Sequence, residues 1–257
     1  MSTVTVVMPV HEAEATLAAS IASVRGQSFE DWRLILVDDA STDGSRAIAQ
    51  QAVEQDPRIE LVPLEEQSGA AVARNTAIAR AESRWIAFCD SDDLWLPTKL
   101  ERQLAFAAET GNPLTFTSYA KIHGTDEVEA ATWTGGERVV HAKDRVDYKD
   151  LRKQNFIGCS TAMFDAEVFG KRPMPLIERR QDYALWLDLL RDGAVARGLD
   201  EVLVLYREGG RASLSSNKLK AATYNWRIYR EIEGWSLPVS AMAFASYAVR
   251  GVLKSRI

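Results

Sequence analysis

The chain has little cysteine, no excess of basic residues and no long apolar run. Its two cysteines, Cys89 and Cys159, lie inside apolar segments without a metal-type spacing, which favours buried, reduced thiols. The net charge of −5 argues against generic nucleic-acid binding, which requires a basic face. No apolar segment reaches the length of a membrane span, and no basic region precedes the first apolar stretch as in a signal peptide. We therefore expect a cytoplasmic protein with no nucleic-acid partner.

The first half of the chain alternates between short apolar strands and helices. Apolar, β-branched or aromatic runs predict strands at residues 4–8, 33–37, 59–63 and 85–89. Apolar residues at helical spacing, or an alanine-rich composition, predict helices at residues 17–24, 48–53 and 69–81. This alternation predicts βαβ units, and hence an α/β fold with a mostly parallel central sheet.

The second half is less regular. The sequence predicts strands at residues 114–119, 158–164 and 202–206, and a helix around 185–190. The polar stretch between residues 125 and 150 is expected to contain a hairpin or a loop excursion. No repeat, low-complexity tract or linker separates the halves, so we expect one continuous domain.

Three carboxylates follow the predicted strand at residues 85–89, in the sequence Asp90-Ser91-Asp92-Asp93. They lie at the carboxyl end of a strand, where open α/β sheets place their ligands. Crowded carboxylates repel one another unless a cation or hydrogen-bond donors offset their charge. A divalent metal that holds an anionic substrate would do so, whereas a plain surface turn is the alternative for this cluster taken alone.

Four segments, taken in order, carry a family resemblance. They are Val6 to His11, Val37 to Asp43, Gly69 to Asn75 and Phe88 to Asp93. Together they resemble the family 2 glycosyltransferases of the GT-A fold, and the resemblance continues more weakly to about Arg211. It implies a Rossmann-like, three-layer α/β/α fold and a nucleotide-sugar donor, most often a UDP-sugar, bound with Mn²⁺ or Mg²⁺.

The resemblance implies a role in donor binding for Pro9, His11 and Asp39. A carboxylate can accept the imide hydrogen of uracil, and the match assigns that role to Asp39. The alternative for Asp39 is a helix cap or a turn acid. His11 stands where the family more often has tyrosine, and Glu12 where it often has asparagine, so an unremarkable loop histidine stays open.

The resemblance also implies a diphosphate and metal site. Arg74 becomes a donor contact, because guanidinium suits phosphate geometry, although a solvated helix arginine is the alternative. Asp92 is the first choice for a metal ligand, and Asp90 either contacts the ribose or completes the metal shell. Asp93 alternatively caps a helix that starts at Pro97.

The catalytic base is expected in the second half. The segment Arg179 to Leu187 resembles the family's late motif, in which an acid precedes an apolar helix. The resemblance assigns the base to Asp182, and the alternative is a helix N-cap. Trp186, one turn later, lines the acceptor side or belongs to the core, which is the commoner fate of such an aromatic. Arg207 and Arg211 either close over the diphosphate or lie in a basic surface loop with no role.

We divide the chain into a domain at 1–215, made of a nucleotide-sugar-binding half (1–110) and an acceptor and catalytic half (111–215), and a helical tail at 216–257. The tail's last helix has an apolar face that contains Met242 and Ala245, and it either lies on a membrane surface or packs on protein.

The expected activity is inverting, metal-dependent transfer of a sugar to a glycan or lipid-linked acceptor, in surface polysaccharide synthesis. This places the protein in the cytoplasm, or peripherally on the inner face of the membrane. A softer resemblance of residues 151–164 is to enzymes that build capsular or teichuronic-acid-type polymers. The alternatives are a sugar nucleotidyltransferase, although no Gly-rich phosphate loop follows the first strand, and a non-catalytic nucleotide-sugar or glycan-binding protein on a GT-A scaffold.

Overall fold

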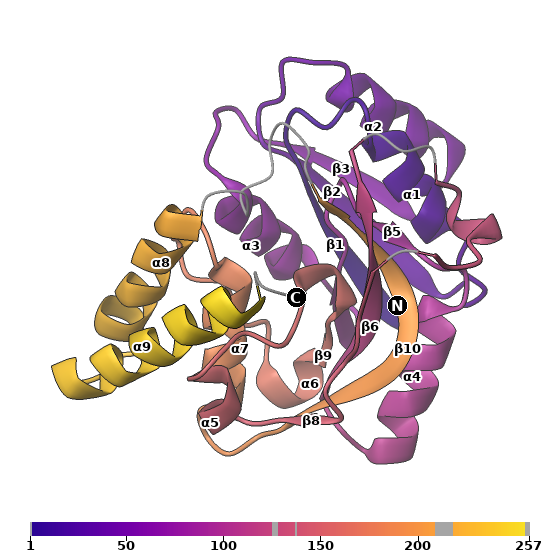
Figure 1. Ribbon diagram of the computed structural model, residues 1–257. Helices are drawn as coiled ribbons and strands as arrows, with labels where there is room; N and C mark the ends of the chain where they lie inside the picture. Colours follow the sequence, from indigo (N-terminus) through magenta and orange to yellow (C-terminus); the bar gives the residue numbers. More distant parts are fainter. Residues whose placement is uncertain (1, 125–127, 137, 209–217, 255–257) are drawn as a thin grey trace.

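The computed structural model describes residues 2–124, 128–136, 138–208 and 218–254 (Figure 1). The strands of these residues are β1 Val4–Val10, β2 Trp32–Asp38, β3 Ile59–Pro63, β4 Trp85–Phe88, β5 Leu94–Trp95, β6 Leu114–His123, β7 Val139–Val140, β8 Arg145–Val146, β9 Met163–Asp165 and β10 Ala196–Glu208. The α-helices are α1 Leu17–Arg25, α2 Ser45–Gln55, α3 Ala70–Arg80, α4 Lys99–Thr110, α5 Tyr148–Leu151, α6 Ala166–Phe169, α7 Gln181–Leu190, α8 Lys218–Arg227 and α9 Leu237–Lys254.

One sheet runs through both predicted halves of the chain, in the order β3-β2-β1-β4-β9-β6-β10-β5, with β7 beside β6 and β8 beside β10. The longest strand pairings are parallel: β1 with β2 and β4, β2 with β3, and β6 with β10. The shorter pairings, such as β4 with β9, are antiparallel. The chain winds from β1 outward to β3 and then returns to place β4 on the other side of β1. Doubly wound sheets bind their ligands at such a reversal, which here lies at the carboxyl ends of β1 and β4.

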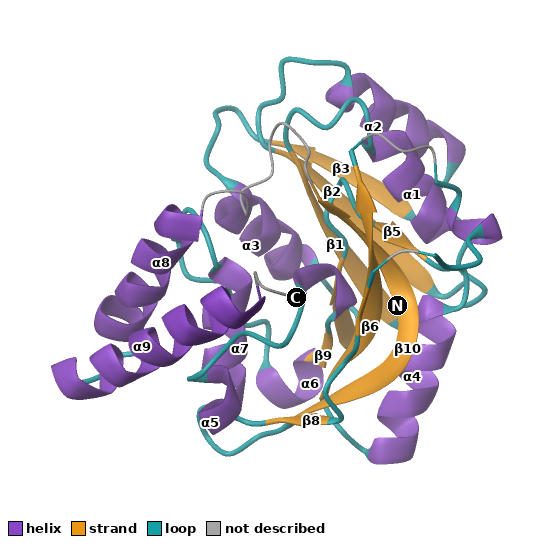
Figure 2. Cartoon of the chain, in the orientation of Figure 1, coloured by secondary structure: helices purple, strands orange, loops and turns teal. Residues whose placement is uncertain are grey.

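Helices cover both faces of the sheet (Figure 2). Side chains of β1 alternate between two buried clusters, because successive residues of a strand point to opposite faces. Val6 and Met8 pack in the cluster that includes α1 and α4, whereas Val7 packs with α3 and α7. Because both faces of β1 are buried, its sequence does not alternate between polar and apolar residues and is a nearly continuous apolar run. The predicted three-layer α/β/α architecture is confirmed.

The segment at residues 158–164 differs from the predicted single strand. Cys159–Thr161 forms a 3₁₀ turn, and the strand β9 is confined to Met163–Asp165. The hydroxyl of Thr161 donates to the carbonyl oxygen of Gly158 (2.7 Å), and that of Ser160 accepts from the backbone N–H of Asp90 (3.0 Å). Hydroxyls that bond to backbone groups in this way compete with a strand ladder, and residue composition alone does not reveal it.

The C-terminal segment packs on the domain. After α8 the chain forms a π-helical stretch, Ile228–Ile232, and then α9. Ile228, Tyr229 and Ala243 are buried in the same cluster as the side chains of α7. The face of α9 that contacts the domain is therefore not the predicted apolar face, since Met242 of that face is 65% exposed. Ser240 and Ala243 are buried on the contacting face, and Phe244 of the same helix packs edge to face on Trp226, with ring centroids 5.7 Å apart. Among the described residues, every helix falls short of the length or the apolar character that a transmembrane helix requires.

An aromatic contact joins β4 to α7. The rings of Phe88 and Trp186 meet edge to face, with centroids 5.8 Å apart, and Phe164 stacks on Phe88 at 6.1 Å. Trp186 is fully buried, so it belongs to the core. Because β4 leads into the acidic loop and α7 carries Asp182, this contact fixes the spacing of the two segments.

We expect Trp186→Ala to lower the free energy of unfolding by about 3–5 kcal/mol, because it removes a large buried side chain and leaves a cavity. Trp186→Phe should cost less, since it keeps ring packing and removes an indole N–H that has no hydrogen-bond partner among the described residues. Urea unfolding followed by circular dichroism measures both changes. The exposed control Met242→Ala should stay within about 0.5 kcal/mol of wild type. Equal losses in Trp186→Ala and Met242→Ala would contradict the assignment of Trp186 to the core.

Candidate active site

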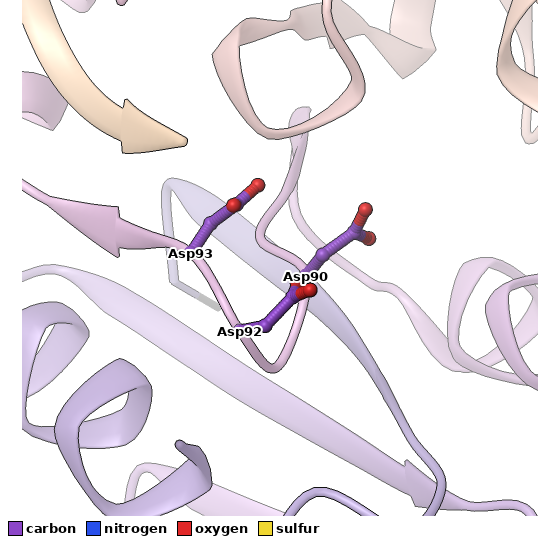
Figure 3. A group of neighbouring side chains, drawn as sticks. All are labelled: Asp90, Asp92 and Asp93. Carbon is purple, nitrogen blue, oxygen red and sulfur yellow. The ribbon is translucent and has the colours of Figure 1, made fainter. Parts of the chain in front are cut away.

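Three carboxylates occupy the loop between β4 and β5, at the carboxyl end of β4 (Figure 3). One oxygen from each of Asp90, Asp92 and Asp93 lies within 4.8 Å of the others. Burial, and then the charge of Asp90, raise the pKa of Asp92 to about 6. The loop therefore concentrates negative charge that the described side chains do not fully offset. Carboxylate oxygens at this spacing fit a hard divalent cation such as Mg²⁺ or Mn²⁺.

Asp93 differs from its two neighbours because its side chain is fully buried, whereas Asp90 and Asp92 are partly exposed. Its carboxylate accepts a hydrogen bond from the Ser160 hydroxyl (2.5 Å) and another from the backbone N–H of Arg207 (3.0 Å). The alternative role of Asp93 as a helix cap is wrong, as is the predicted helix start at Pro97. The next helix begins at Lys99, and its N-cap position is Thr98.

Arg207 binds the acidic loop. Its side chain is 6% exposed, and Nε donates to the carbonyl oxygen of Asp92 (3.1 Å) while Nη1 donates to that of Gly124 (2.8 Å). The alternative of a surface arginine without a role is therefore wrong for Arg207. Arg211 lies outside the described residues.

Arg74 reaches the same loop from α3. Its Nη2 donates to Oδ1 of Asp90 at 2.5 Å, and the side chain is buried. The alternative of a solvated helix arginine is therefore wrong. Although burial alone lowers the pKa of Arg74, the negative charge of Asp90 raises it above the ordinary value, helped by Cys159 and Asp182. Arg74 is thus paired with Asp90, and the negative charge of Asp182 also acts on its guanidinium group.

Asp182 is the second residue of α7, so it is not the helix N-cap; Arg180 holds that position. Its carboxylate accepts a long hydrogen bond from Nδ2 of Asn155 (3.4 Å). Burial raises the pKa of Asp182, and the positive charges of Arg180 and Arg74 only partly offset this effect. A carboxyl group with a raised pKa, next to a metal-type cluster, is suited to take a proton from a hydroxyl.

Asp39, the predicted uracil-binding residue, binds the loop that precedes α3. Its buried carboxylate accepts backbone N–H bonds from Ser68 (2.7 Å) and Gly69 (2.8 Å), and so orders the loop before α3. Gly69 has φ of +90°, a conformation that glycine adopts without strain. Asp39 is thus a loop-ordering acid with lone pairs left for a ligand, since each carboxylate oxygen accepts two hydrogen bonds.

His11 lies beside Asp39. Its Nδ1 lies 2.9 Å from the backbone oxygen of Asp39, and its Nε2 lies 2.9 Å from Nε2 of Gln67. Because the carbonyl only accepts and the amide nitrogen only donates, this geometry assigns the proton to Nδ1. Pro9, two residues earlier, pairs with Val37 of β2, so the predicted donor residues of the two strands lie at one edge.

Residues with a strained backbone lie within two positions of predicted site residues. Among the described residues other than glycine, positive φ occurs at Glu12, Ala40 and Arg180. They directly follow His11 and Asp39, or lie two positions before Asp182. Such conformations cost about 1–3 kcal/mol each and persist where the surrounding structure demands them, commonly at functional sites.

The sequence did not single out Ser160 or Asn155 as site residues. Each contacts its acid across a long stretch of chain, 67 residues from Ser160 to Asp93 and 27 from Asn155 to Asp182. No spacing rule relates residues so far apart, so their roles depend on the tertiary fold.

Comparison with known proteins agrees with this geometry. The family model described as glycosyl transferase family 2 matches residues 5–172. The chain is 43% identical to the putative teichuronic acid biosynthesis glycosyltransferase TuaG of Bacillus subtilis, over 98% of this chain and 96% of that protein. It is 34% identical to the Escherichia coli UDP-Glc:alpha-D-GlcNAc-diphosphoundecaprenol beta-1,3-glucosyltransferase WfgD, over 88% and 84% of the two chains.

Solved structures share the fold at low identity. TarS of S. aureus, solved as a fragment in complex with UDP-GlcNAc, superimposes with a TM-score of 0.72 at 17% identity, over 96% of this chain and 71% of that one. The mannosyltransferase PcManGT from Pyrobaculum calidifontis, in complex with GDP-Man and Mn²⁺, gives a TM-score of 0.67 at 16% identity, over 96% and 75%. The GT-A fold expected from the sequence is confirmed. With a family match over more than half its length and near full-length relatives, the chain belongs to glycosyl transferase family 2.

Proposed function

We propose that this enzyme transfers a sugar, with inversion, from a nucleoside-diphosphate sugar to a hydroxyl of a glycan or lipid-linked acceptor. The observation that carries the proposal is the ion pair between Arg74 and Asp90, with a carboxylate oxygen of Asp92 within 4.8 Å of one of Asp90. The negative charge of Asp182 acts on the same guanidinium group. That arrangement combines a cation site, a phosphate-type guanidinium and a candidate base.

The donor that we propose is a UDP-sugar. WfgD carries UDP-Glc in its name, and the TarS structure holds UDP-GlcNAc. In this chain the uracil would bind at Asp39 and His11, beside Pro9, with the carboxylate of Asp39 accepting the imide N–H through its remaining lone pairs. Arg74 would contact the diphosphate, because its Nε has no hydrogen-bond partner among the described residues.

The cofactor that we propose is Mn²⁺ or Mg²⁺, held by Asp92 with Asp90 completing the shell. The raised pKa of Asp92 supports this, because it arises from burial and from the negative charge of Asp90, and a bound cation would offset both effects. When bound, the ion supplies positive charge that stabilises the departing diphosphate.

Asp182 is the proposed general base. As the acceptor oxygen bonds to the anomeric carbon, Asp182 takes the hydroxyl proton, and the bond from that carbon to the diphosphate oxygen breaks with both electrons leaving on the diphosphate. Attack from the side opposite the leaving group inverts the anomeric centre. Asn155 holds the carboxylate of Asp182 by one long bond, which leaves oxygen lone pairs for the acceptor.

We propose surface polysaccharide as the product, supported by the name of the relative TuaG.

Our proposed division of the chain is a catalytic domain at 1–215, whose donor and acceptor halves meet near residue 110, and a helical tail at 216–257. We also propose that the tail touches the inner face of the membrane, because Leu237 and Met242 of α9 are 60% and 65% exposed.

The donor and metal assignment is tested by release of free nucleoside diphosphate from a panel of nucleotide sugars with Mn²⁺. We expect metal-dependent release from one donor, and at least a roughly 100-fold loss in Asp92→Ala, because second-shell changes alone already cost 10–100-fold. Asp144→Ala, which removes an exposed carboxylate paired with Arg197, is the control and should keep full activity. The assignment fails if wild type shows no metal-dependent binding of any nucleotide sugar.

The base is tested by Asp182→Asn, which keeps the shape of the side chain and removes its ability to take a proton. We expect turnover to fall by about 10²–10⁴-fold while donor affinity stays at the wild-type value. Steady-state transfer and equilibrium donor binding separate the two effects. A loss of donor affinity that accounts for the whole defect would show that Asp182 binds substrate instead.

The pH dependence gives a second readout of the same assignment. The pKa of Asp182 is raised above 3.8, the value of an ordinary aspartate. Asp182 therefore becomes protonated, and can no longer act as a base, at a pH above 3.8. At saturating Mn²⁺ the acidic limb of kcat/KM should therefore lie above pH 3.8 in wild type and be absent from the residual activity of Asp182→Asn. A limb that persists in the variant would belong to another group.

The tail proposal predicts that Leu237→Gln and Met242→Gln together weaken co-sedimentation with anionic vesicles, since both side chains are exposed and neither supports the core. Point variants are preferable to deletion, because Ile228, Tyr229 and Ala243 contribute to the core. Val168→Gln, at 62% exposure outside the tail, is the control. Unchanged binding in the double variant would exclude these side chains from membrane contact.

A further inference from the structure

The three carboxylates of the acidic loop are not equivalent. Asp90 and Asp92 are partly exposed, but Asp93 is fully buried and both of its oxygens accept hydrogen bonds. Asp93 therefore faces the protein interior, although its oxygens lie close enough to its neighbours for a shared cation.

Ser160 joins the two ends of the loop. Its hydroxyl accepts from the backbone N–H of Asp90 (3.0 Å) and donates to the carboxylate of Asp93 (2.5 Å). The carbonyl oxygen of Ser160 accepts from the indole N–H of Trp95 (2.9 Å), which fixes the 3₁₀ turn against β5. A single buried hydroxyl thus sets the distance across the segment that carries Asp92.

Arg207 holds the other side of the loop. Its backbone N–H donates to Asp93, and its Nε donates to the carbonyl oxygen of Asp92. Nη1 extends the same guanidinium to Gly124 at the end of β6. The loop is therefore bound at its first, third and fourth residues by groups from β10 and from the turn before β9.

We propose that Asp93, Ser160 and Arg207 form a loop clamp that positions the carboxylates of Asp90 and Asp92 for a divalent cation, and that Asp93 is not itself a ligand. This inference rests on the proposed metal-dependent function. The clamp acts through Asp90 and Asp92, so its members are positioning residues. Groups that orient metal ligands typically contribute 10–100-fold to metal affinity.

The test measures Mn²⁺ affinity by the electron paramagnetic resonance signal of free Mn²⁺, with UDP present and a protein-free UDP blank. We expect Ser160→Ala to weaken Mn²⁺ binding by roughly 10–100-fold. Arg207→Lys should weaken Mn²⁺ binding similarly, because lysine lacks the guanidinium fork that binds the loop. Lysine keeps the positive charge near Asp92 and the backbone N–H, so the variant tests the fork alone. Asp93→Asn should weaken Mn²⁺ binding less than Asp92→Asn, which removes a ligand.

Ser118→Ala is the matched control. Ser118 is also buried, donates to an aspartate at 2.6 Å (Asp200) and accepts a backbone N–H at 2.8 Å (Ala142), but it is not part of the acidic loop. Unfolding midpoints of all variants separate lost stability from lost metal affinity. We expect both serine variants to lose stability, and only Ser160→Ala to lose Mn²⁺ affinity.

The outcomes distinguish the clamp from the proposed function. Wild-type Mn²⁺ affinity in both Ser160→Ala and Arg207→Lys, with binding lost in Asp92→Asn, would overturn the clamp and leave the metal site standing. Loss of binding in Asp93→Asn as complete as in Asp92→Asn would make Asp93 a ligand and also overturn it. If wild type binds no Mn²⁺, the proposed function and the clamp fail together.

Discussion

The geometry of the acidic loop depends on the burial of the Asp93 carboxylate. A carboxylate removed from water costs several kcal/mol unless hydrogen-bond donors replace its hydration. Ser160 and the backbone of Arg207 supply two such donors, and burial still raises the pKa of Asp93. Any movement of the loop away from the turn at residues 159–161 or from β10 leaves this group unpaired. In the proposed clamp, this buried group therefore positions the partly exposed carboxylates of Asp90 and Asp92.

The rest of the site follows from how the sheet brings distant segments to this loop. The reversal of strand order at β1 and β4 places His11, Asp39 and the acidic loop along one edge. Asp182 comes from α7, which lies on one face of the sheet, and the Phe88–Trp186 contact sets its distance from β4. The donor end thus depends on strand pairing, whereas the position of the base depends on core packing.

Much of this arrangement could be predicted from the sequence, and the remainder has a common physical origin. The position of the acidic loop followed from an apolar run that ends in carboxylates, because strand ends and ligand sites coincide in open sheets. Ser160 and Arg207 could not be placed, since they meet Asp93 across 67 and 114 residues of chain. The turn at residues 159–161 resembles the start of a strand because the apolar residues 162–164 follow it directly, whereas the hydroxyl bonds of Ser160 that hold the turn are tertiary. The packing face of α9 could not be predicted for a similar reason, since it depends on tertiary contacts such as that of Phe244 with Trp226.

The charge balance of the site explains why a donor and a cation belong together in the proposed reaction. Arg74 reaches the acidic loop from α3, where Asp90 holds it in an ion pair at 2.5 Å. Its charge is consequently shared, and Asp92 and Asp182 add further negative charge at the same place. A diphosphate that entered alone would meet the partly exposed carboxylates of Asp90 and Asp92 as well as the arginines, and a cation that entered alone would leave part of its coordination shell to water. Each ligand therefore supplies what the other lacks, and linkage requires that each strengthen the binding of the other by the same factor.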